Sequence, residues 1–312
     1  MSKRAKRILI VLALLALVAS LPFVIIRLLR PPRTGHTAEL FQGISHVRQA
    51  RSTPRPLVVH VVEIDLRTQG ISFLVTPGDS SKGLEVTART ASEFLEEFSM
   101  QVAVNGSFSL PFRAGSFLWD YYPHSGEPVD VTGVAISNGE MYSGYDGWPA
   151  LCITAEQVEI KQSGCPQGTL QALAGSQILV EDGKSMVEQG AGGPNPRTAV
   201  AVDEEGKTLW LIVVDGRQRG YSEGVTLEEL AGIAVEFGAD RALNLDGGGS
   251  STLVIADGGG PRALNSPIHT RIPTRQRPVA NHLGVYVQPI EEEKPEGLGE
   301  GTFIRAVPDA FV

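Results

Sequence analysis

Residues 242–252 read ALNLDGGGSST, and this stretch constrains how the chain around it must fold. Residues 242–245 form an apolar run of strand type, and residues 252–255 form a second one. The three glycines between them allow a sharp turn, because glycine adopts backbone conformations that other residues avoid. The pattern therefore predicts a strand, a glycine loop and a second strand.

The same loop carries polar groups that suggest a site. Consecutive glycines let several backbone N–H groups point at one spot, which suits an anion, and here they are Gly247, Gly248 and Gly249. Asp246, Ser250 and Ser251 add a carboxyl group and two hydroxyls. The segment is not a P-loop, since the lysine and its spacing are missing. A plain bend between two strands is the alternative; the flanking polar residues favour a binding or catalytic site.

The rest of the chain reads mainly as strands with a few helices. Helices are expected at 91–98 and 226–237, each introduced by a capping box that begins at Thr90 and at Thr226. Asn138-Gly139 predicts a hairpin. Strands are expected at 58–64, 71–75, 102–104, 131–136, 140–142, 177–180, 197–202, 209–214, 242–245, 252–255 and 283–287. This pattern predicts an α+β fold with a mixed β-sheet core and a few flanking helices.

The N-terminus predicts a membrane segment. Four basic residues within positions 3–7 precede an uncharged run of 19 residues, Ile8–Ile26. This length suits one transmembrane helix, and the basic cluster would stay in the cytoplasm, which leaves the remainder exported. A cleaved signal peptide is the alternative, since residues 18–20 resemble a cleavage site. The apolar run continues past them, which favours an uncleaved anchor.

Composition divides the chain further. We expect an anchor or signal segment at 1–30, a proline-containing linker at 31–56, a folded domain at 57–290, and an acidic, glycine-containing tail at 291–312. The formal net charge of −8 argues against nucleic acid as the partner, because such binding needs a basic surface.

The two cysteines fit an exported protein. Cys152 and Cys165 flank a strand–turn–strand pattern, so a disulfide that staples a hairpin is expected over two free thiols. Two cysteines do not make a four-cysteine zinc site, and the six histidines show no metal spacing. We expect no cofactor, with a divalent cation such as calcium on the carboxylates as the alternative.

Charged residues next to predicted strands suggest the chemistry. Arg197 and Arg217 are candidates for bidentate phosphate binding, against the common alternative of a surface ion pair. Asp215 and Asp246 both follow apolar strands, and glycosidic cleavage commonly uses two carboxylates. If both face one cleft they fit that pairing; a turn-capping role for Asp215 is the alternative. Serine hydrolase chemistry is disfavoured, because Ser250 lies in no Gly-x-Ser-x-Gly elbow.

Taken in order, these segments resemble the phosphodiester glycosidase family over roughly residues 85–290. The motifs are Asn105-Gly106, the run from Arg197 to Val200, the run from Val214 to Arg217, the stretch 222–230, the block 242–252 and the run from Arg277 to Asn281. The block 242–252 is the most specific of them. Family members commonly read Asn-Gly-Gly-Phe-Phe at the first motif, whereas Ser107 and Ser109 depart from it here.

The resemblance implies a hydrolase that removes a sugar, of N-acetylglucosamine type, from a sugar-1-phosphodiester in an envelope or extracellular glycan. It implies that Asp246 and Asp215 are catalytic and that Arg197, Arg217 and the glycine-loop N–H groups bind phosphate. Asn105 would orient a sugar hydroxyl or the phosphate. Bacterial relatives are associated with exopolysaccharide. The alternative is a non-catalytic envelope domain that binds anionic glycans through the same loops.

Overall fold

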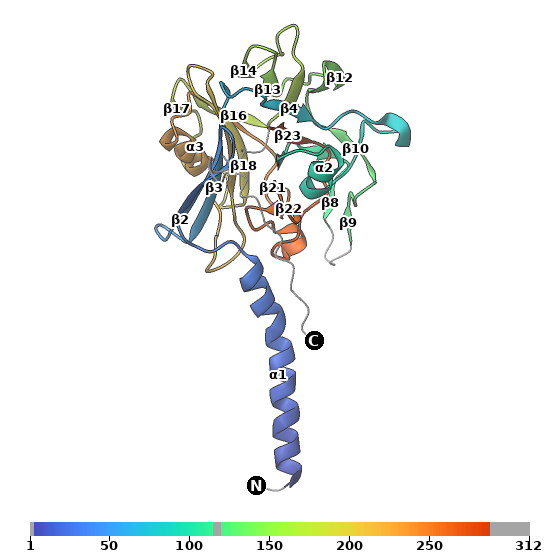
Figure 1. Ribbon diagram of the computed structural model, residues 1–312, viewed down its shortest axis with the longest axis vertical. Helices are drawn as coiled ribbons and strands as arrows, with labels where there is room; N and C mark the ends of the chain where they lie inside the picture. Colours follow the sequence, from blue (N-terminus) through green and yellow to red (C-terminus); the bar gives the residue numbers. More distant parts are fainter. Residues whose placement is uncertain (1–2, 115–119, 288–312) are drawn as a thin grey trace, which may run out of the picture.

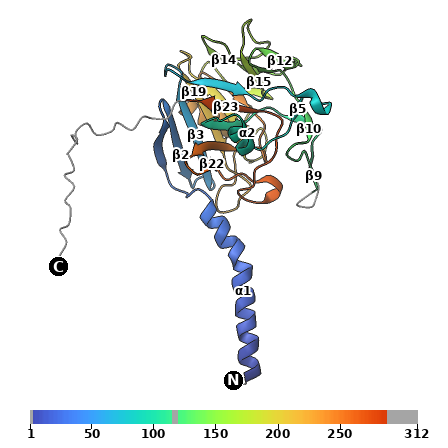
Figure 2. The same ribbon diagram turned by 45° about the vertical axis from the view of Figure 1, so that its right-hand side comes forward.

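The computed structural model describes residues 3–114 and 120–287, so the expected tail at 291–312 lies outside the described residues. Two β-sheets stack face to face, and one helix covers the outer face of each (Figure 1). A long N-terminal helix projects away from this body (Figures 1 and 2). The sheet-rich α+β class expected from the sequence is confirmed.

The first sheet has eight strands in the order β1-β2-β3-β19-β18-β20-β16-β17. Their bounds are His36–Phe41, Ile44–Arg51, Leu57–Asp65, Thr208–Val214, Arg197–Val202, Arg241–Asn244, Gln177–Glu181 and Lys184–Ser185. Strand β19 shows why this sheet lies inside the protein: Leu209, Leu211 and Val213 enter one core, and the alternate residues Trp210 and Ile212 enter another. Successive side chains point to opposite faces of a strand, so both faces are covered.

Helix α3, Leu227–Glu236, covers the outer face of this first sheet. The second sheet covers the inner face, in the order β22-β21-β6-β23-β4. Its strands are Gly260–Ala263, Leu253–Asp257, Val102–Asn105, His282–Tyr286 and Ser72–Val75. Helix α2, Ala91–Glu97, packs through Phe94 and Leu95 on the far face of that sheet.

A third sheet, two small ladders and two 3₁₀ turns complete the described part of the body. Its order is β12-β11-β15-β13-β14, with bounds Glu140–Ser143, Ala135–Ser137, Gln171–Ala174, Ala150–Ile153 and Val158–Lys161. Small ladders join β5, β10 and β7 (Val86–Thr87, Pro128–Val131, Ser109–Leu110) and β8 with β9 (Arg113–Ala114, Tyr121–Tyr122), and short 3₁₀ turns span Ser80–Lys82 and His269–Arg271. Cys152 and Cys165 form the expected disulfide beside the β13–β14 hairpin.

Local sequence signals explain several of these elements. Thr90 and Thr226 each accept a hydrogen bond from the backbone N–H three residues on, and Glu93 and Glu229 complete the two capping boxes. Asn138 has φ +50° and joins β11 to β12 with Gly139, as the Asn-Gly pair predicts.

Two expectations need correction. The core is not a mixed sheet, because every named strand pair in the described residues is antiparallel, and the chain needs few helical crossovers as a result. Residues 31–56 are not a linker throughout, since β1 and β2 fall within them and β2 pairs with β3 along its length. These strands carry polar residues on a solvent-facing side, which concealed them among the charged and proline residues.

The N-terminal run forms helix α1, Lys3–Leu29, with many of its apolar side chains exposed. Across the described part of the chain, no helix combines the length and the apolar character needed to cross a membrane, so the expected transmembrane helix is not confirmed.

Candidate active site

The glycine loop connects the two stacked sheets. It follows β20 in the first sheet and leads into β21 in the second. Asn105, at the end of β6, fastens it: its side-chain N–H donates to the backbone oxygen of Asp246 at 2.7 Å, and its side-chain oxygen accepts from Thr198 and from the N–H of Thr252. One buried amide therefore ties the loop to both sheets.

Two glycines of the loop leave room for arginines. Gly248 has φ +66°, and a Cβ there would lie 3.1 Å from the guanidinium of Arg217. A Cβ on Gly249 would lie 2.4 Å from a guanidinium nitrogen of Arg277, closer than atoms can approach. The glycines thus permit two cations to lie against the loop backbone, which few other residues would allow.

Asp246 is linked to Arg277 through a serine. The Ser250 hydroxyl donates to Oδ2 of Asp246 at 2.5 Å and accepts from Arg277 at 3.1 Å. The Nε–H of Arg277 donates to Nδ1 of His269 at 3.1 Å. Because Nδ1 of His269 accepts, its proton resides on Nε2. Burial, with help from the neighbouring arginines, lowers the pKa of His269 to about 3, so this histidine is neutral and holds Arg277 in place.

The protonation of Asp246 is shifted. Burial raises the pKa of its carboxyl group above the ordinary value. The Ser250 hydrogen bond and the positive charges of Arg277 and Arg217 act in the opposite direction but do not cancel the effect. Asp246 therefore keeps its proton to higher pH than an ordinary aspartic acid, which is a property of general acids.

A pocket of about 450 Å³ opens above Asp246 and Arg277. Its walls are mainly apolar and aromatic, a composition typical of small-molecule sites; the lining residues are Phe108, Ser109, Leu110, Phe112, Thr132, Trp148, Asp246 and Arg277. Phe108 and Trp148 meet edge to face at 5.4 Å. The pocket thus joins aromatic walls, which suit the C–H face of a sugar ring, to one carboxyl group and one cation.

Further arginines surround the loop. Arg217 is exposed, and its Nε–H donates to the side-chain oxygen of Asn195 at 3.0 Å. Although part of this side chain meets solvent, partial burial of its guanidinium group, followed by the charge of Arg271, lowers the pKa of Arg217. Arg197 donates to the backbone oxygens of Val225 and of Gly193, and neither Arg197 nor Arg217 lines the pocket itself. These cations create a positive rim that favours an anion beside Asp246.

The backbone near this rim is strained. Arg217, Thr270, Arg271 and Thr274 all have φ between +51° and +68°, a region that side-chain-bearing residues rarely adopt. Each such residue costs of order 1–3 kcal/mol, and such residues concentrate at functional sites. Three of these residues, Thr270, Arg271 and Thr274, lie within seven residues before Arg277 in the chain.

Asp215 lies in different surroundings. Its side chain is fully buried and accepts from the N–H of Ser266 at 2.8 Å, Asn265 at 3.1 Å and the Tyr221 hydroxyl at 3.3 Å, and it contacts Nε2 of His60 at 3.3 Å. Asp215 does not line the pocket. The structure therefore does not bring the two carboxyl groups together there, as the two-carboxylate hypothesis required.

Asp215 does reach the glycine loop indirectly. The same Asn265 amide that donates to Asp215 also donates to the backbone oxygen of Ser251 at 3.0 Å, and its oxygen accepts from the N–H of Leu253. Asp215 thus helps to hold Asn265, and Asn265 holds the far end of the loop.

Other expected site residues serve the protein itself. Both ends of the Asn105 amide are used internally, as described above. The Gly248 N–H donates a hydrogen bond to the backbone oxygen of Pro196, and the Gly247 N–H donates one to the Asp246 carboxyl group. Both N–H groups therefore already have partners within the protein. Ser250 joins Asp246 to Arg277, whereas the Ser251 side chain is buried.

Sequence reasoning missed the residues that shape the pocket. The sequence marks Arg277 only as the first residue of the motif Arg277 to Asn281. An arginine at the start of such a motif could have been proposed as a further phosphate-binding residue. Of the aromatic walls, Phe108 and Phe112 lie on either side of β7, and Trp148 lies in the loop two residues before β13 of the third sheet. Nothing in their spacing along the sequence indicates that they meet.

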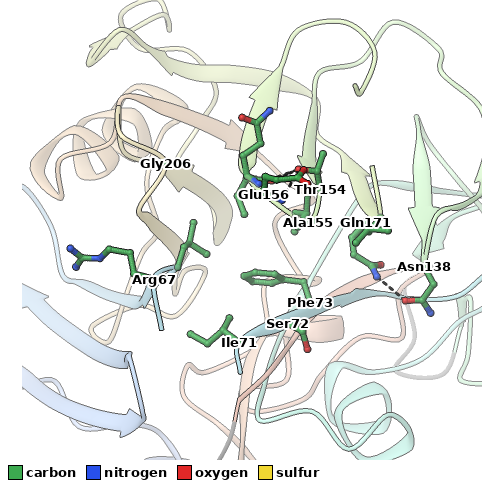
Figure 3. Close-up of a pocket in the computed structure, with 15 residues that line it drawn as sticks. Arg67, Ile71, Ser72, Phe73, Asn138, Thr154, Ala155, Glu156, Gln171 and Gly206 are labelled. Atoms are coloured by element: carbon green, nitrogen blue, oxygen red, sulfur yellow. Dashed lines mark hydrogen bonds between the residues drawn. The ribbon is translucent and has the colours of Figure 1, made fainter. Parts of the chain in front are cut away.

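A larger cavity of about 650 Å³ lies elsewhere, where the turns after β3 and β13 approach Gly206 (Figure 3). Ile71 and Phe73 point into it, and Gln171 donates to Asn138 at its edge (Figure 3). Its lining includes Arg67 and Glu156 but no residue of the glycine loop 246–251. Within the described residues, no group of three or more His, Cys, Asp or Glu side chains is arranged to hold a metal ion.

Solved structures of similar fold include proteins from three organisms. The catalytic domain of zebrafish N-acetylglucosamine-1-phosphodiester alpha-N-acetylglucosaminidase, auto-inhibited by its pro-peptide, aligns with a TM-score of 0.56 at 20% identity, over 82% of this chain and 88% of that one. A Synechocystis protein aligns with a TM-score of 0.55 at 17% sequence identity, over 83% of this chain and 64% of that one. A Burkholderia pseudomallei protein aligns with a TM-score of 0.55 at 15% sequence identity, over 74% of each chain.

These likenesses concern the fold, and this chain spans only 64% of the length of the Synechocystis protein. No curated protein sequence matches the chain. Residues 98–286, however, match the model of the phosphodiester glycosidase family, and this range includes the glycine loop, Arg217 and Arg277. Because the match covers more than half of the sequence, the chain belongs to the phosphodiester glycosidase family.

Proposed function

We propose that the chain hydrolyses a sugar-1-phosphodiester and releases the sugar, which is of N-acetylglucosamine type. The observation that carries this proposal is one pocket in which Asp246, with its raised pKa, lies beside Arg277 under aromatic walls. Membership of the family and a fold like that of the zebrafish enzyme support the same reaction class.

In the proposed mechanism the sugar ring packs on the aromatic wall formed by Phe108 and Trp148. Arg277, together with Arg217 on the rim, binds the phosphate oxygens, since guanidinium groups pair well with phosphate. The charge that develops on the departing phosphate is then stabilised by groups already in place. Neutral His269 and the Ser250 hydroxyl hold Arg277 in this position.

Asp246 acts as the general acid in this proposal. Its carboxyl proton passes to the bridging phosphate oxygen as the bond between the sugar C1 and that oxygen breaks. A water oxygen then bonds to C1, and the proton released by that water returns to the Asp246 carboxylate. Asp215 takes no part in proton transfer; it holds the loop through Asn265.

The test uses the full chain and a panel of sugar-1-phosphodiesters, beginning with N-acetylglucosamine-1-phosphate esters, with and without a chelator. We expect release of free sugar by the wild type and release about 10³-fold slower by Asp246→Asn, since general acid catalysis contributes typically about 10²–10⁴-fold. Asp257→Asn is the matched control, because Asp257 is an exposed aspartate on β21. Binding of these esters without turnover, by protein shown to be folded, would replace the proposal by a glycan-binding domain. Turnover that stops with the chelator would assign a role to a divalent cation.

We also propose that the enzyme acts outside the cytoplasm and that residues 1–30 are its signal or membrane attachment. The Cys152–Cys165 disulfide favours an oxidising compartment, and α1 presents exposed apolar side chains from Leu9 to Leu29. Cell fractionation and N-terminal sequencing test this. Full-length protein in the cytosolic fraction, with both thiols reduced, would refute it.

A further inference from the structure

A second basic site lies at the base of α1, well separated in sequence from the catalytic loop. A cavity of about 830 Å³ opens between the end of that helix and a turn of the body, lined by Leu28, Arg30, Pro31, Pro32, Arg33, Arg219, Gly220 and Tyr221. It shares no lining residue with the pocket at Asp246. Figures 1 and 2 show α1 leaving the body at one end.

Three arginines face this cavity without an acidic partner. Among the ion pairs of the described residues, none includes Arg30, Arg33 or Arg219. The Nε atoms of Arg30 and Arg33 are buried and have no hydrogen-bond partner within the described structure. Leaving buried polar groups unpaired is costly, so these arginines are poised for a ligand that accepts hydrogen bonds.

The surroundings hold the arginines in place. The Arg30 guanidinium lies 5.1 Å from the centre of the Tyr221 ring, and Arg33 donates to the backbone oxygen of Arg51 at 2.9 Å. Pro31 and Pro32 fix the backbone between the two arginines, because the proline ring restricts φ. Asp215 is the acidic group whose charge reaches Arg30, and it lies behind Tyr221, fully buried and already bonded to four other groups. Net positive charge therefore remains at the cavity.

The cavity combines cations with apolar surface. Leu28 lines it, and exposed apolar side chains continue along α1 in the direction of the N-terminus. A phosphate group would satisfy the guanidinium groups through paired hydrogen bonds. An adjoining apolar chain would cover Leu28 and its neighbours. We propose that this cavity, the α1-base arginine site, binds a phosphate group.

Two sources could supply that phosphate, an anionic lipid or a soluble phosphate compound. The first arm of the test measures flotation of the full chain with phosphatidylcholine vesicles, with or without phosphatidylglycerol. The variant carries Arg30→Gln, Arg33→Gln and Arg219→Gln. The control carries Lys161→Gln, Lys207→Gln and Arg262→Gln, which removes the same charge from exposed positions paired elsewhere. Neutral vesicles report the contribution of α1 itself.

For a lipid source we expect the variant to bind phosphatidylglycerol vesicles about 10²-fold more weakly than the control, since each arginine near an anionic surface contributes about 1 kcal/mol, or a factor of about five. Binding to neutral vesicles should be equal.

The second arm titrates inorganic phosphate and glycerol phosphate by calorimetry at constant ionic strength. It uses proteins that also carry Arg217→Gln and Arg277→Gln, so that the catalytic pocket does not contribute. Loss of binding in the triple variant in this arm alone would support the site with a soluble phosphate ligand. Equal behaviour of variant and control in both arms would overturn the proposal. Because neither arm measures hydrolysis, a failure here leaves the proposed reaction unaffected.

Discussion

Asp246 and Asp215 both follow a buried apolar strand, yet the fold gives them different surroundings. Asp246 lines a pocket, has a raised pKa and is bonded to one serine that leads to an arginine. Asp215 is enclosed by Ser266, Asn265 and Tyr221, which all donate to its carboxyl group. If Asp246 is the acid, as we propose, the difference teaches that a catalytic carboxyl group lacks the complete set of internal hydrogen-bond partners that encloses a structural one such as Asp215.

The largest effect is expected for Asp246→Asn. General acid catalysis contributes typically about 10²–10⁴-fold, so kcat/KM should fall by about 10³-fold while the circular dichroism spectrum is unchanged. Asp257→Asn should match the wild type, because Asp257 is exposed and pairs only with Arg262 in the described structure. Steady-state kinetics of both variants on one ester measures this difference in kcat/KM. Near-normal turnover by folded Asp246→Asn would exclude Asp246 as the general acid.

Arg277→Lys should have the next largest effect. Lysine keeps the charge but loses the fork that contacts both Ser250 and His269. Loss of a hydrogen bond made by one charged group costs about 1.5–3 kcal/mol, so kcat/KM should fall by roughly 10–100-fold. Arg262→Lys on β22 is the control and should be unchanged. If Arg277→Lys were equally unchanged, Arg277 would not bind the phosphate.

Asp215→Asn should affect stability more than turnover. The amide can replace only part of the carboxylate's contacts with Ser266, Asn265 and Tyr221, and breaking a buried charged network costs about 3 kcal/mol. The free energy of unfolding, measured in urea, should fall by this amount, while kcat/KM of the folded protein falls less than about tenfold. A loss of turnover as large as that of Asp246→Asn, without a loss of stability, would restore the two-carboxylate hypothesis.

Gly248→Ala separates backbone strain from arginine placement. Gly139 is its match: both glycines have positive φ, but a Cβ at Gly139 meets nothing within 4 Å. Each substitution should cost about 1–2 kcal/mol of stability, because a side chain disfavours the left-handed region. Only Gly248→Ala should also lower kcat/KM, since its methyl group displaces Arg217. Equal kinetics in the two variants would remove Arg217 from the phosphate site.

The smallest effect concerns pH and stability. Burial raises the pKa of Asp246 in the folded protein above its unfolded value. The folded state then binds the proton more tightly, so this contribution to stability is complete below the unfolded pKa and is lost as pH rises through the folded pKa. Near neutral pH the wild type must keep a buried, ionised carboxylate at this position, whereas Asp246→Asn has a neutral amide there. The variant should therefore unfold at a higher temperature than the wild type near neutral pH, and the difference should vanish in acid, where Asp246 is protonated. The opposite trend in melting scans would mean that the ionised carboxylate is the favoured form.

Much of the local structure was accessible from the sequence. Capping boxes at Thr90 and Thr226 and the Asn138 turn are short-range signals, and they formed as expected. The hairpin of β1 and β2 was missed because its polar residues resemble those of a linker. The separation of Asp215 from the pocket was also missed, since it depends on Asn265, which lies 50 residues away in the chain.

The most direct measurement is the position of an oxygen-18 label after hydrolysis of an N-acetylglucosamine-1-phosphodiester in labelled water by the full chain. The whole chain is used because a truncated protein that began at Pro54 would lack β1 and β2, and β2 pairs with β3 in the first sheet. If Asp246 protonates the bridging oxygen while the C1–O bond breaks, the label appears in the free sugar and the phosphate product carries none. Label in the phosphate would mean cleavage of the P–O bond, which contradicts the glycosidase mechanism proposed for this pocket.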